Sequence, residues 1–249
     1  MELSYTVFDP TGNITVLVET PVPAAEQPRA ASALMAREPL CEQVCFRMPD
    51  TPGADITVRM AGGEFCGNAS MSAAARLCCE RGWERAAVSV AIGGQLVPVA
   101  VEQTGESCWR CAVTMPRALR VSEAFGLPLV ELPGISHLIV RTPMARATAE
   151  SSIRGWCRAL GASALGLMLL DEERQRLEAL VYVPQADTLC WERSCASGTA
   201  AVGAWAGPGT ALSLTEPGGV LCVRTAIDGT VTLEGTVRAA GERKCIFTI

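Results

Sequence analysis

Two stretches of the sequence decide the fold: GEFCGNASMS at residues 63–72 and WERSCASGT at residues 191–199. Each stretch places a cysteine, Cys66 or Cys195, at a turn that is rich in Gly, Ser or Asn. The two cysteines lie about half the 249-residue chain apart. Because the same pattern occurs once in each half, we expect two related domains.

A run of small residues follows each cysteine and has helical character, at residues 69–77 and 199–205. Residues 196–206 carry no charge at all. A helix that is apolar on every side is buried on every side. We therefore predict an α/β (α+β) fold of two pseudo-symmetric domains, each a barrel-like sheet wrapped around one central helix. One of these domains would carry Cys66 and the other Cys195.

Apolar and β-branched runs bounded by turn residues predict the strands that would surround these helices. Two more segments, 29–37 and 147–159, are predicted as helices. The expected strands are 5–8, 14–18, 43–48, 56–60, 88–92, 96–101, 108–115, 138–140, 165–170, 180–183, 220–225, 230–237 and 245–249.

Composition excludes several classes of function. Apolar residues make up 49% of the chain and charged residues 19%, which is enough for a packed core. The net charge of −5, without a cluster of Lys or Arg, argues against nucleic acid as a partner. Apolar runs such as 165–170 are too short to cross a bilayer, and the first residues lack a basic, apolar leader. We expect a cytoplasmic protein with no membrane partner.

The chain has twelve cysteines and one histidine, His137. A reducing compartment argues against a disulfide framework. The C-x-x-C pair of Cys108 and Cys111 has no second pair at matching spacing, so we expect no metal site. Most of the thiols are expected to pack as small buried hydrophobes.

A cysteine in the first turn of a helix lies where backbone N–H groups are unpaired and the helix dipole is positive. Such a position is expected to lower the pKa of the thiol. The same N–H groups can bind a carboxylate. The expected donors are Gly67, Asn68 and Ala69 after one cysteine, and Ala196, Ser197 and Gly198 after the other.

Two thiols on either side of a shared carboxylate site suit one reaction. One sulfur removes the proton of an α-carbon and the other returns a proton on the opposite face, which inverts the centre without a cofactor. The pair must then share one proton at rest. Two alternatives stay open from the residues alone: buried packing of both cysteines, and a non-catalytic amino-acid-binding or redox module.

The motif from Cys66 to Ala69 resembles the first active-site motif of the diaminopimelate epimerase superfamily, and residues 192–199 resemble the second. Gly12, Asn13, Gln43 and residues 134–137 follow in the expected order. The resemblance implies an epimerase or racemase that is independent of pyridoxal phosphate, in which Cys66 and Cys195 are the bases. It also implies that the last strand returns to the first domain. The expected domains are therefore residues 1–117 with 241–249, carrying Cys66, and residues 118–240, carrying Cys195.

Two departures argue against diaminopimelate as the substrate. Ile135 stands where those epimerases carry an Asn, and the strand 165–170 lacks a second one. Residues 41–43, 63–72, 168–175 and 191–199 instead resemble the histidine racemases of staphylopine-type metallophore biosynthesis. In that branch the acid matching Glu42 would face the imidazole or steer the proton balance, and in the superfamily as a whole the residue matching Asn13 reaches the substrate. The resemblance therefore implies interconversion of L- and D-histidine, or of a related amino acid with a basic side chain.

The resemblance also assigns expected roles to the motif around Cys195. Glu192 would orient the thiol or bind the substrate ammonium. The alternative is that Glu192 only caps the helix that follows. Arg193, Ala196, Ser197 and Gly198 are expected to bind substrate together with Gln43, Gly67 and Asn68. Proline or hydroxyproline racemases, diaminopimelate epimerases and phenazine-type isomerases stay as alternatives. A small-molecule amino acid is the expected ligand, and the oligomeric state is left open between monomer and homodimer.

Overall fold

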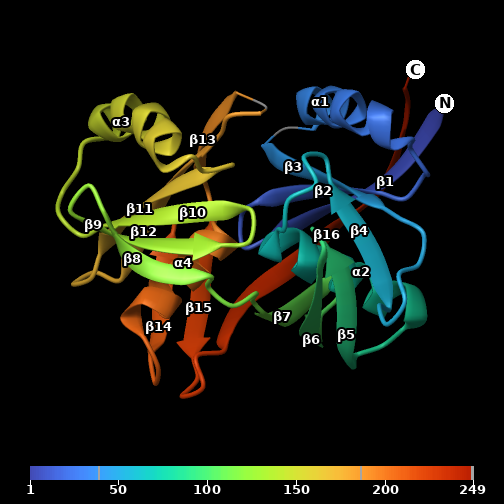
Figure 1. The fold of residues 1–249 in the computed structure, drawn as a ribbon. Helices are drawn as coiled ribbons and strands as arrows, with labels where there is room; N and C mark the ends of the chain where they lie inside the picture. The colour runs from blue at the N-terminus through green and yellow to red at the C-terminus, as the bar shows by residue number, and fades with distance from the viewer. Residues whose placement is uncertain (39, 186, 248–249) are drawn as a thin grey trace. The chain divides into compact units, whose positions relative to one another are not determined.

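The computed structural model describes residues 1–38, 40–185 and 187–247. The chain divides into two compact units, Met1–Thr114 with Glu234–Ile249, and Met115–Leu233 (Figure 1). The second division falls inside the long strand β16 (Val231–Ile246). The domain boundaries expected from the sequence, after residues 117 and 240, lie a few residues further along.

The strands of the first unit close on themselves. They run in the order β1-β2-β3-β4-β5-β6-β7-β16, and β16 pairs back to β1 in antiparallel fashion. Closure leaves no sheet edge exposed and creates an interior. The strands are β1 (Glu2–Pro10), β2 (Ile14–Val18), β3 (Cys41–Arg47), β4 (Ile56–Met60), β5 (Arg85–Ile92), β6 (Gln95–Gly105) and β7 (Cys108–Thr114).

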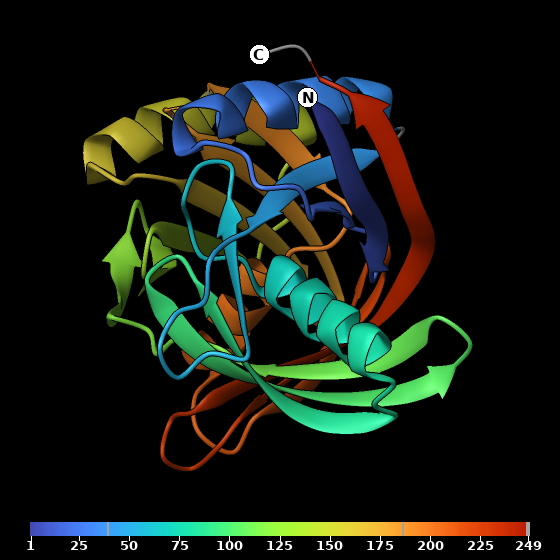
Figure 2. The same ribbon diagram turned by 90° about the vertical axis from the view of Figure 1, so that its right-hand side faces the viewer.

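Helix α2 (Gly67–Arg81) occupies that interior and contacts β1, β2, β4, β5, β6 and β7. In Figure 2 it is the teal helix lying against the green strands β5 to β7. Ala, Ser, Gly and Asn dominate its first turns, and residues 67–75 are all buried. Small side chains let the sheet approach the helix from several sides. The helix ends at Gly82, whose φ of 65° is the left-handed conformation that favours glycine.

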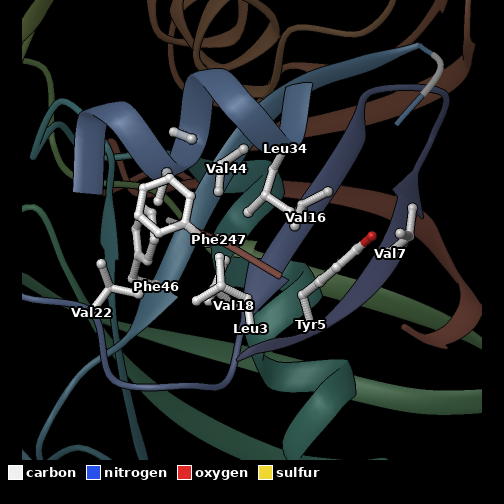
Figure 3. Packing of buried hydrophobic residues seen from close by; sticks show 12 residues of the cluster. Leu3, Tyr5, Val7, Val16, Val18, Val22, Leu34, Val44, Phe46 and Phe247 are labelled. Carbon is white, nitrogen blue, oxygen red and sulfur yellow. The ribbon is translucent and has the colours of Figure 1, made fainter. Parts of the chain in front are cut away.

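Helix α1 (Gln27–Arg37), preceded by the short 3-10 helix η1 (Ala24–Glu26), covers the outer face of β1, β2 and β3. Figure 3 shows the apolar core between them, to which Leu34 of the helix and Phe46 of β3 contribute. Side chains alternate along a strand, so the outward Val16 and Val18 leave Thr15 facing the barrel interior. By the same alternation, Gln43 and Cys45 of β3 face inward. The barrel interior therefore receives a few polar groups beside α2.

The second unit is a sheet in the order β15-β14-β12-β11-β10-β9-β8, with β13 paired to β12. Its strands are β8 (Arg120–Ala124), β9 (Leu127–Leu132), β10 (Ile135–Val140), β11 (Leu165–Asp171), β12 (Arg176–Val183), β13 (Thr188–Glu192), β14 (Ala211–Glu216) and β15 (Gly219–Thr225).

Two helices cover opposite faces of this sheet. Helix α4 (Ala196–Ala206) contacts β9, β10, β11, β14 and β15, and α3 (Arg146–Leu160) contacts β11 and β12. On β11, Leu165 and Leu167 pack in the cluster with α3, and Met168 and Leu170 pack in the cluster with α4. This explains why the strand is apolar along its whole length, since both of its faces are buried.

The expected fold class is confirmed: each unit is a sheet wrapped around a helix of small residues. Strands β8, β9, β13 and β14 were not predicted from the sequence, and a turn was predicted where β13 ends. The expected strand 245–249 is the end of β16, which reaches Ile246; residues 248 and 249 lie outside the described residues. No helix in the described ranges is long and apolar enough to cross a membrane.

Candidate active site

Cys66 is the residue that begins α2. It has extended backbone angles (φ −143°, ψ 119°), and its Sγ accepts a hydrogen bond from the backbone N–H of Ala69 at 3.4 Å. The hydroxyl of Ser70 donates to the carbonyl oxygen of Cys66 at 2.8 Å, which fixes the backbone from the other side. The residue as a whole is half-buried. The predicted position of this thiol in the first turn of a buried helix is thus the observed one.

A chain of polar groups leads from the Cys66 thiol across β3 and β2. The thiol donates to Oε1 of Gln43 at 3.1 Å, and Nε2 of Gln43 donates to the Thr15 hydroxyl at 2.6 Å. The Thr15 hydroxyl in turn donates to the backbone oxygen of Asn13 at 3.1 Å. Because Thr15 uses its proton on Asn13, the Gln43 amide turns its oxygen toward the sulfur. Thr15 was not predicted as part of the site. It lies on β2 directly opposite Gln43 of β3, and this strand pairing is the signal that locates it.

A register shift aims Glu42 at Asn13. Ile14 pairs with Cys41 and Thr15 pairs with Gln43, so Glu42 is the extra residue in β3. Such bulges re-aim a side chain that regular pairing would send to the other face. The Asn13 amide donates to Oε2 of Glu42 at 2.7 Å. Glu42 and Gln43, although neighbours on one strand, thus belong to one hydrogen-bonded group that includes Asn13 and Thr15.

Cys195 begins α4 in the same way that Cys66 begins α2. Its φ is −117° and ψ is 97°, and its Sγ accepts from the backbone N–H of Gly198 at 3.4 Å. A Cβ added at Gly198 would lie 2.1 Å from Sδ of Met168 and 3.1 Å from Sγ of Cys195. A larger residue at this position would require the side chain of Met168 on β11 to move.

The Cys195 thiol is buried among acids. Burial raises its pKa well above 9, and the carboxylates of Glu192 and Glu216 raise it further. The prediction that the helix N-terminus would lower the pKa is therefore wrong for this cysteine. Desolvation and two nearby negative charges outweigh the partial positive charge of the helix end.

Glu192 ends β13 and is a hydrogen-bond partner of the Cys195 thiol. Desolvation raises the pKa of its carboxyl to about 7, while the thiol contact lowers it. This carboxyl can therefore be neutral or charged near neutral pH. Ser197 adds a hydroxyl 3.6 Å from the Cys195 sulfur.

Because side chains alternate along a strand, Trp191 and its neighbour Glu192 point to opposite faces of the sheet. The Trp191 indole N–H donates to Glu150 of α3 at 2.7 Å, and the guanidinium of Arg146 lies over its ring. Trp191 thus belongs to the α3 face of the sheet and not to the surroundings of Cys195.

The predicted residues fall into two groups, one in each unit. Gly67 and Asn68 form the buried first turn of α2, and Ala196 and Ser197 the first turn of α4. Arg193 lies in the segment before Cys195, where its carbonyl oxygen accepts from the N–H of Gly218 at 2.7 Å. Together the first unit collects Asn13, Glu42, Gln43, Cys66, Gly67 and Asn68, and the second collects Glu192, Arg193, Cys195, Ala196, Ser197 and Gly198.

Glu216, which contacts Cys195 from β14, was not predicted as a neighbour of this cysteine because no sequence motif marks it. No group of three or more His, Cys, Asp or Glu in the described part of the chain could hold a metal ion. His137 is buried in the second unit, where burial lowers its pKa to about 3 and keeps it neutral.

Solved structures share this arrangement of strands and helices. A predicted epimerase from Pseudomonas aeruginosa aligns over 100% of both chains with a TM-score of 0.76 at 15% identity. A hydroxyproline epimerase from Agrobacterium vitis, with bound trans-4-hydroxy-L-proline, aligns over 98% of this chain and 92% of its own, with a TM-score of 0.68 at 13% identity. The chain therefore shares the fold of these epimerases.

Comparison with known sequences identifies the family to which this chain belongs. Residues 2–244 match the family described as "Histidine racemase CntK N-terminal domain". A histidine racemase from Staphylococcus aureus is 30% identical over 218 residues, which cover 81% of this chain and 78% of the relative. A second, from Fusobacterium nucleatum, is 29% identical over 216 residues, or 81% of this chain and 80% of the relative. The chain belongs to the histidine racemase family.

Proposed function

We propose that this protein interconverts L- and D-histidine, with Cys66 and Cys195 acting as the two acid–base groups on opposite faces of the α-carbon. One sulfur takes the α-proton as a thiolate, and the other gives its proton to the opposite face as a thiol. The observation that carries the proposal is that each cysteine begins a buried helix, with its sulfur held by the N–H three residues on.

Both cysteines have neighbours suited to a group that changes its protonation state in every turnover. The Gln43 amide offers an oxygen to a thiol and, when rotated, an N–H to a thiolate. Glu192 has a pKa of about 7 and can accept a proton or carry charge beside Cys195. A merely structural cysteine needs neither kind of neighbour.

The N-termini of α2 and α4 suit the substrate carboxylate, because the helix dipole favours an anion there and backbone N–H groups point toward it. A basic side chain suits Glu42, whose carboxylate is aimed by the bulge and held by Asn13. The names of the relatives add histidine as the particular basic amino acid.

The direct test uses heavy water. L-Histidine and, separately, other single L-amino acids are incubated with the protein without any added cofactor, and optical rotation is followed with loss of the α-proton signal. We expect deuterium to enter the α-position of histidine while the rotation decays to zero. Exchange without inversion, or no exchange with any amino acid, would contradict the proposal.

The same panel tests the alternatives. Turnover of proline or hydroxyproline in place of histidine would assign the chemistry of the structural relatives instead. Amino-acid binding without exchange would favour a binding module. Oxidation of both thiols without any exchange would favour a redox module.

A further inference from the structure

Glu216 is a buried acid that ends β14, with only 4% of its surface exposed. Its Oε2 accepts a hydrogen bond from the backbone N–H of Cys195 at 2.7 Å. Its Oε1 accepts from the hydroxyl of Thr199, one turn into α4. One carboxylate thus holds both ends of the first turn of the helix that Cys195 begins.

The turn after Glu216 holds the same segment through its backbone. The N–H of Gly218 donates to the carbonyl oxygen of Arg193 at 2.7 Å. The segment 193–199 is therefore attached to the β14–β15 hairpin at three points. Charge-assisted hydrogen bonds from an N–H and a hydroxyl satisfy a buried carboxylate and fix its position.

The charge of Glu216 also acts on the Cys195 thiol. Together with Glu192 on β13, it opposes formation of a second negative charge on the sulfur, and both raise the pKa of that thiol. The other titratable groups on strands packed against α4 have different surroundings. His137 on β10 is neutral, Glu131 on β9 pairs with Arg120, Asp171 on β11 pairs with Arg174, and Arg224 on β15 is exposed.

We propose that Glu216 is a positioning residue for the racemisation proposed above, on which this inference rests: it fixes the backbone of Cys195 and keeps the shared proton on that sulfur in the resting enzyme. Cys195 is then the acid at rest and Cys66 is the base. In the first half of turnover the Cys66 thiolate gains the α-proton as an S–H bond forms. The Cys195 S–H bond breaks as its proton passes to the opposite face of the carbon.

The substitution Glu216→Gln removes the negative charge of the carboxylate but keeps the size and the hydrogen bonds of the side chain. The Gln oxygen can still accept from the Cys195 N–H, and its NH₂ can donate to the Thr199 hydroxyl, so both hydrogen bonds survive while the charge is lost. The matched control, Thr199→Val, removes one hydrogen bond and keeps the charge. Titration of Cys195 is followed by thiolate ultraviolet absorbance. Each protein is compared with the same protein carrying Cys195→Ser, so that the difference reports one thiol among twelve.

We expect Glu216→Gln to move the titration of Cys195 to lower pH by about one unit or more. The alkaline limb of the pH profile of kcat/KM for histidine should move in the same direction, and Thr199→Val should move neither. A Cys195 titration in Glu216→Gln that superimposes on that of the unaltered protein would overturn the proposal, as would an equal shift in Thr199→Val. The absorbance titration requires no turnover. Absence of racemisation by the unaltered protein would therefore overturn the proposed function, while the titration still decides the role of Glu216.

Discussion

The side-chain oxygen of Gln43 lies 3.1 Å from the sulfur of Cys66, and the amide nitrogen of the same residue donates to Thr15. This orientation suits Cys66 as a thiol, the form that the proposal above assigns to it after it has taken the α-proton. If Cys66 loses the proton, rotation of the amide presents an N–H to the thiolate, and the Thr15 hydroxyl can then donate to the amide oxygen. The Gln43 amide can thus follow the protonation state of the sulfur.

Replacing Gln43 by Leu should therefore lower kcat for histidine by up to about a hundredfold, because the sulfur loses the partner that positions it in both states. KM should change less, since the helix N–H groups are untouched. Steady-state rates from both L- and D-histidine provide the measurement. Thr15→Val keeps the Gln43 amide but removes the hydroxyl that accepts its hydrogen bond, and it should therefore have a smaller effect on kcat. An unchanged kcat in Gln43→Leu would contradict this role.

Serine at either Cys66 or Cys195 should slow racemisation by about a hundred- to ten-thousandfold, the usual contribution of a general acid or base. A hydroxyl is far less acidic than a thiol and cannot serve as the base near neutral pH. Optical rotation of histidine solutions measures the loss. The matched control is Cys79→Ser, an exposed thiol on the same helix as Cys66. Either catalytic variant retaining full activity would refute the two-base assignment.

Gly198 and Gly155 offer a comparison of two helical glycines. A methyl group at Gly198 would overlap Met168 and press on the Cys195 sulfur, whereas nothing lies within 4 Å of one at Gly155. Gly155→Ala should raise the unfolding free energy by up to about 1 kcal/mol through helix propensity alone. Gly198→Ala should lower both stability and kcat. Urea denaturation and racemisation assays measure the two effects. Equal behaviour of the two variants would show that the close contact is not needed.

The fold could be predicted because its decisive signal is local. A helix of small residues following a cysteine, seen twice, was enough to predict a sheet wrapped around a helix in each half. Strand β8 was missed because its exposed and polar residues give no clear alternation. Strand β14 does alternate, with Leu212 and Leu214 beside polar residues, but its pattern spans only a few residues. Propensity cannot detect a strand whose stability comes from pairing with its neighbours.

The positions of the proposed site residues were predictable only where a motif marks them. The placement of Cys66 and Cys195 at the starts of helices could be predicted from their own neighbours in sequence. Glu216 acts on Cys195 from β14, and such a contact between distant segments leaves no local pattern. The pKa of Cys195 was wrongly predicted for the same reason. The helix end is visible in the sequence, but the burial and the second carboxylate are not.

Glu192 should make stability depend on pH. Its carboxyl has a pKa of about 7 in the folded chain, above the ordinary value of 4.5, so the folded state holds a proton that the unfolded state releases. Its contribution to stability is complete below pH 4.5 and is lost as pH rises through 7. Glu192→Gln should therefore gain about 1 to 3 kcal/mol over the unaltered protein at pH 8 and little at pH 4.5. Urea titrations at the two pH values test this, and an equal gain at both would contradict it.

His137 should make the unfolding free energy depend on pH in the opposite direction to Glu192. Its ring is completely buried, and neither ring nitrogen has a hydrogen-bond partner within the described ranges of the chain. Burial lowers its pKa from 6.5 to about 3, so the unfolded chain takes up a proton that the folded chain refuses. The stability that this neutral ring contributes is present above pH 6.5 and is lost as pH falls toward 3, by at most about 1.4 kcal/mol per unit.

His137→Leu should remove this sensitivity, because leucine fills similar space without a titratable group. We expect its unfolding free energy to exceed that of the unaltered protein at pH 5 by more than it does at pH 7. Urea denaturation at both values, with Glu192→Gln as the background, isolates the histidine from the acid that titrates in an overlapping range. If the variant and its background lose the same stability between pH 7 and pH 5, the ring must be protonated in the folded chain, and the environment of His137 is not the apolar one described.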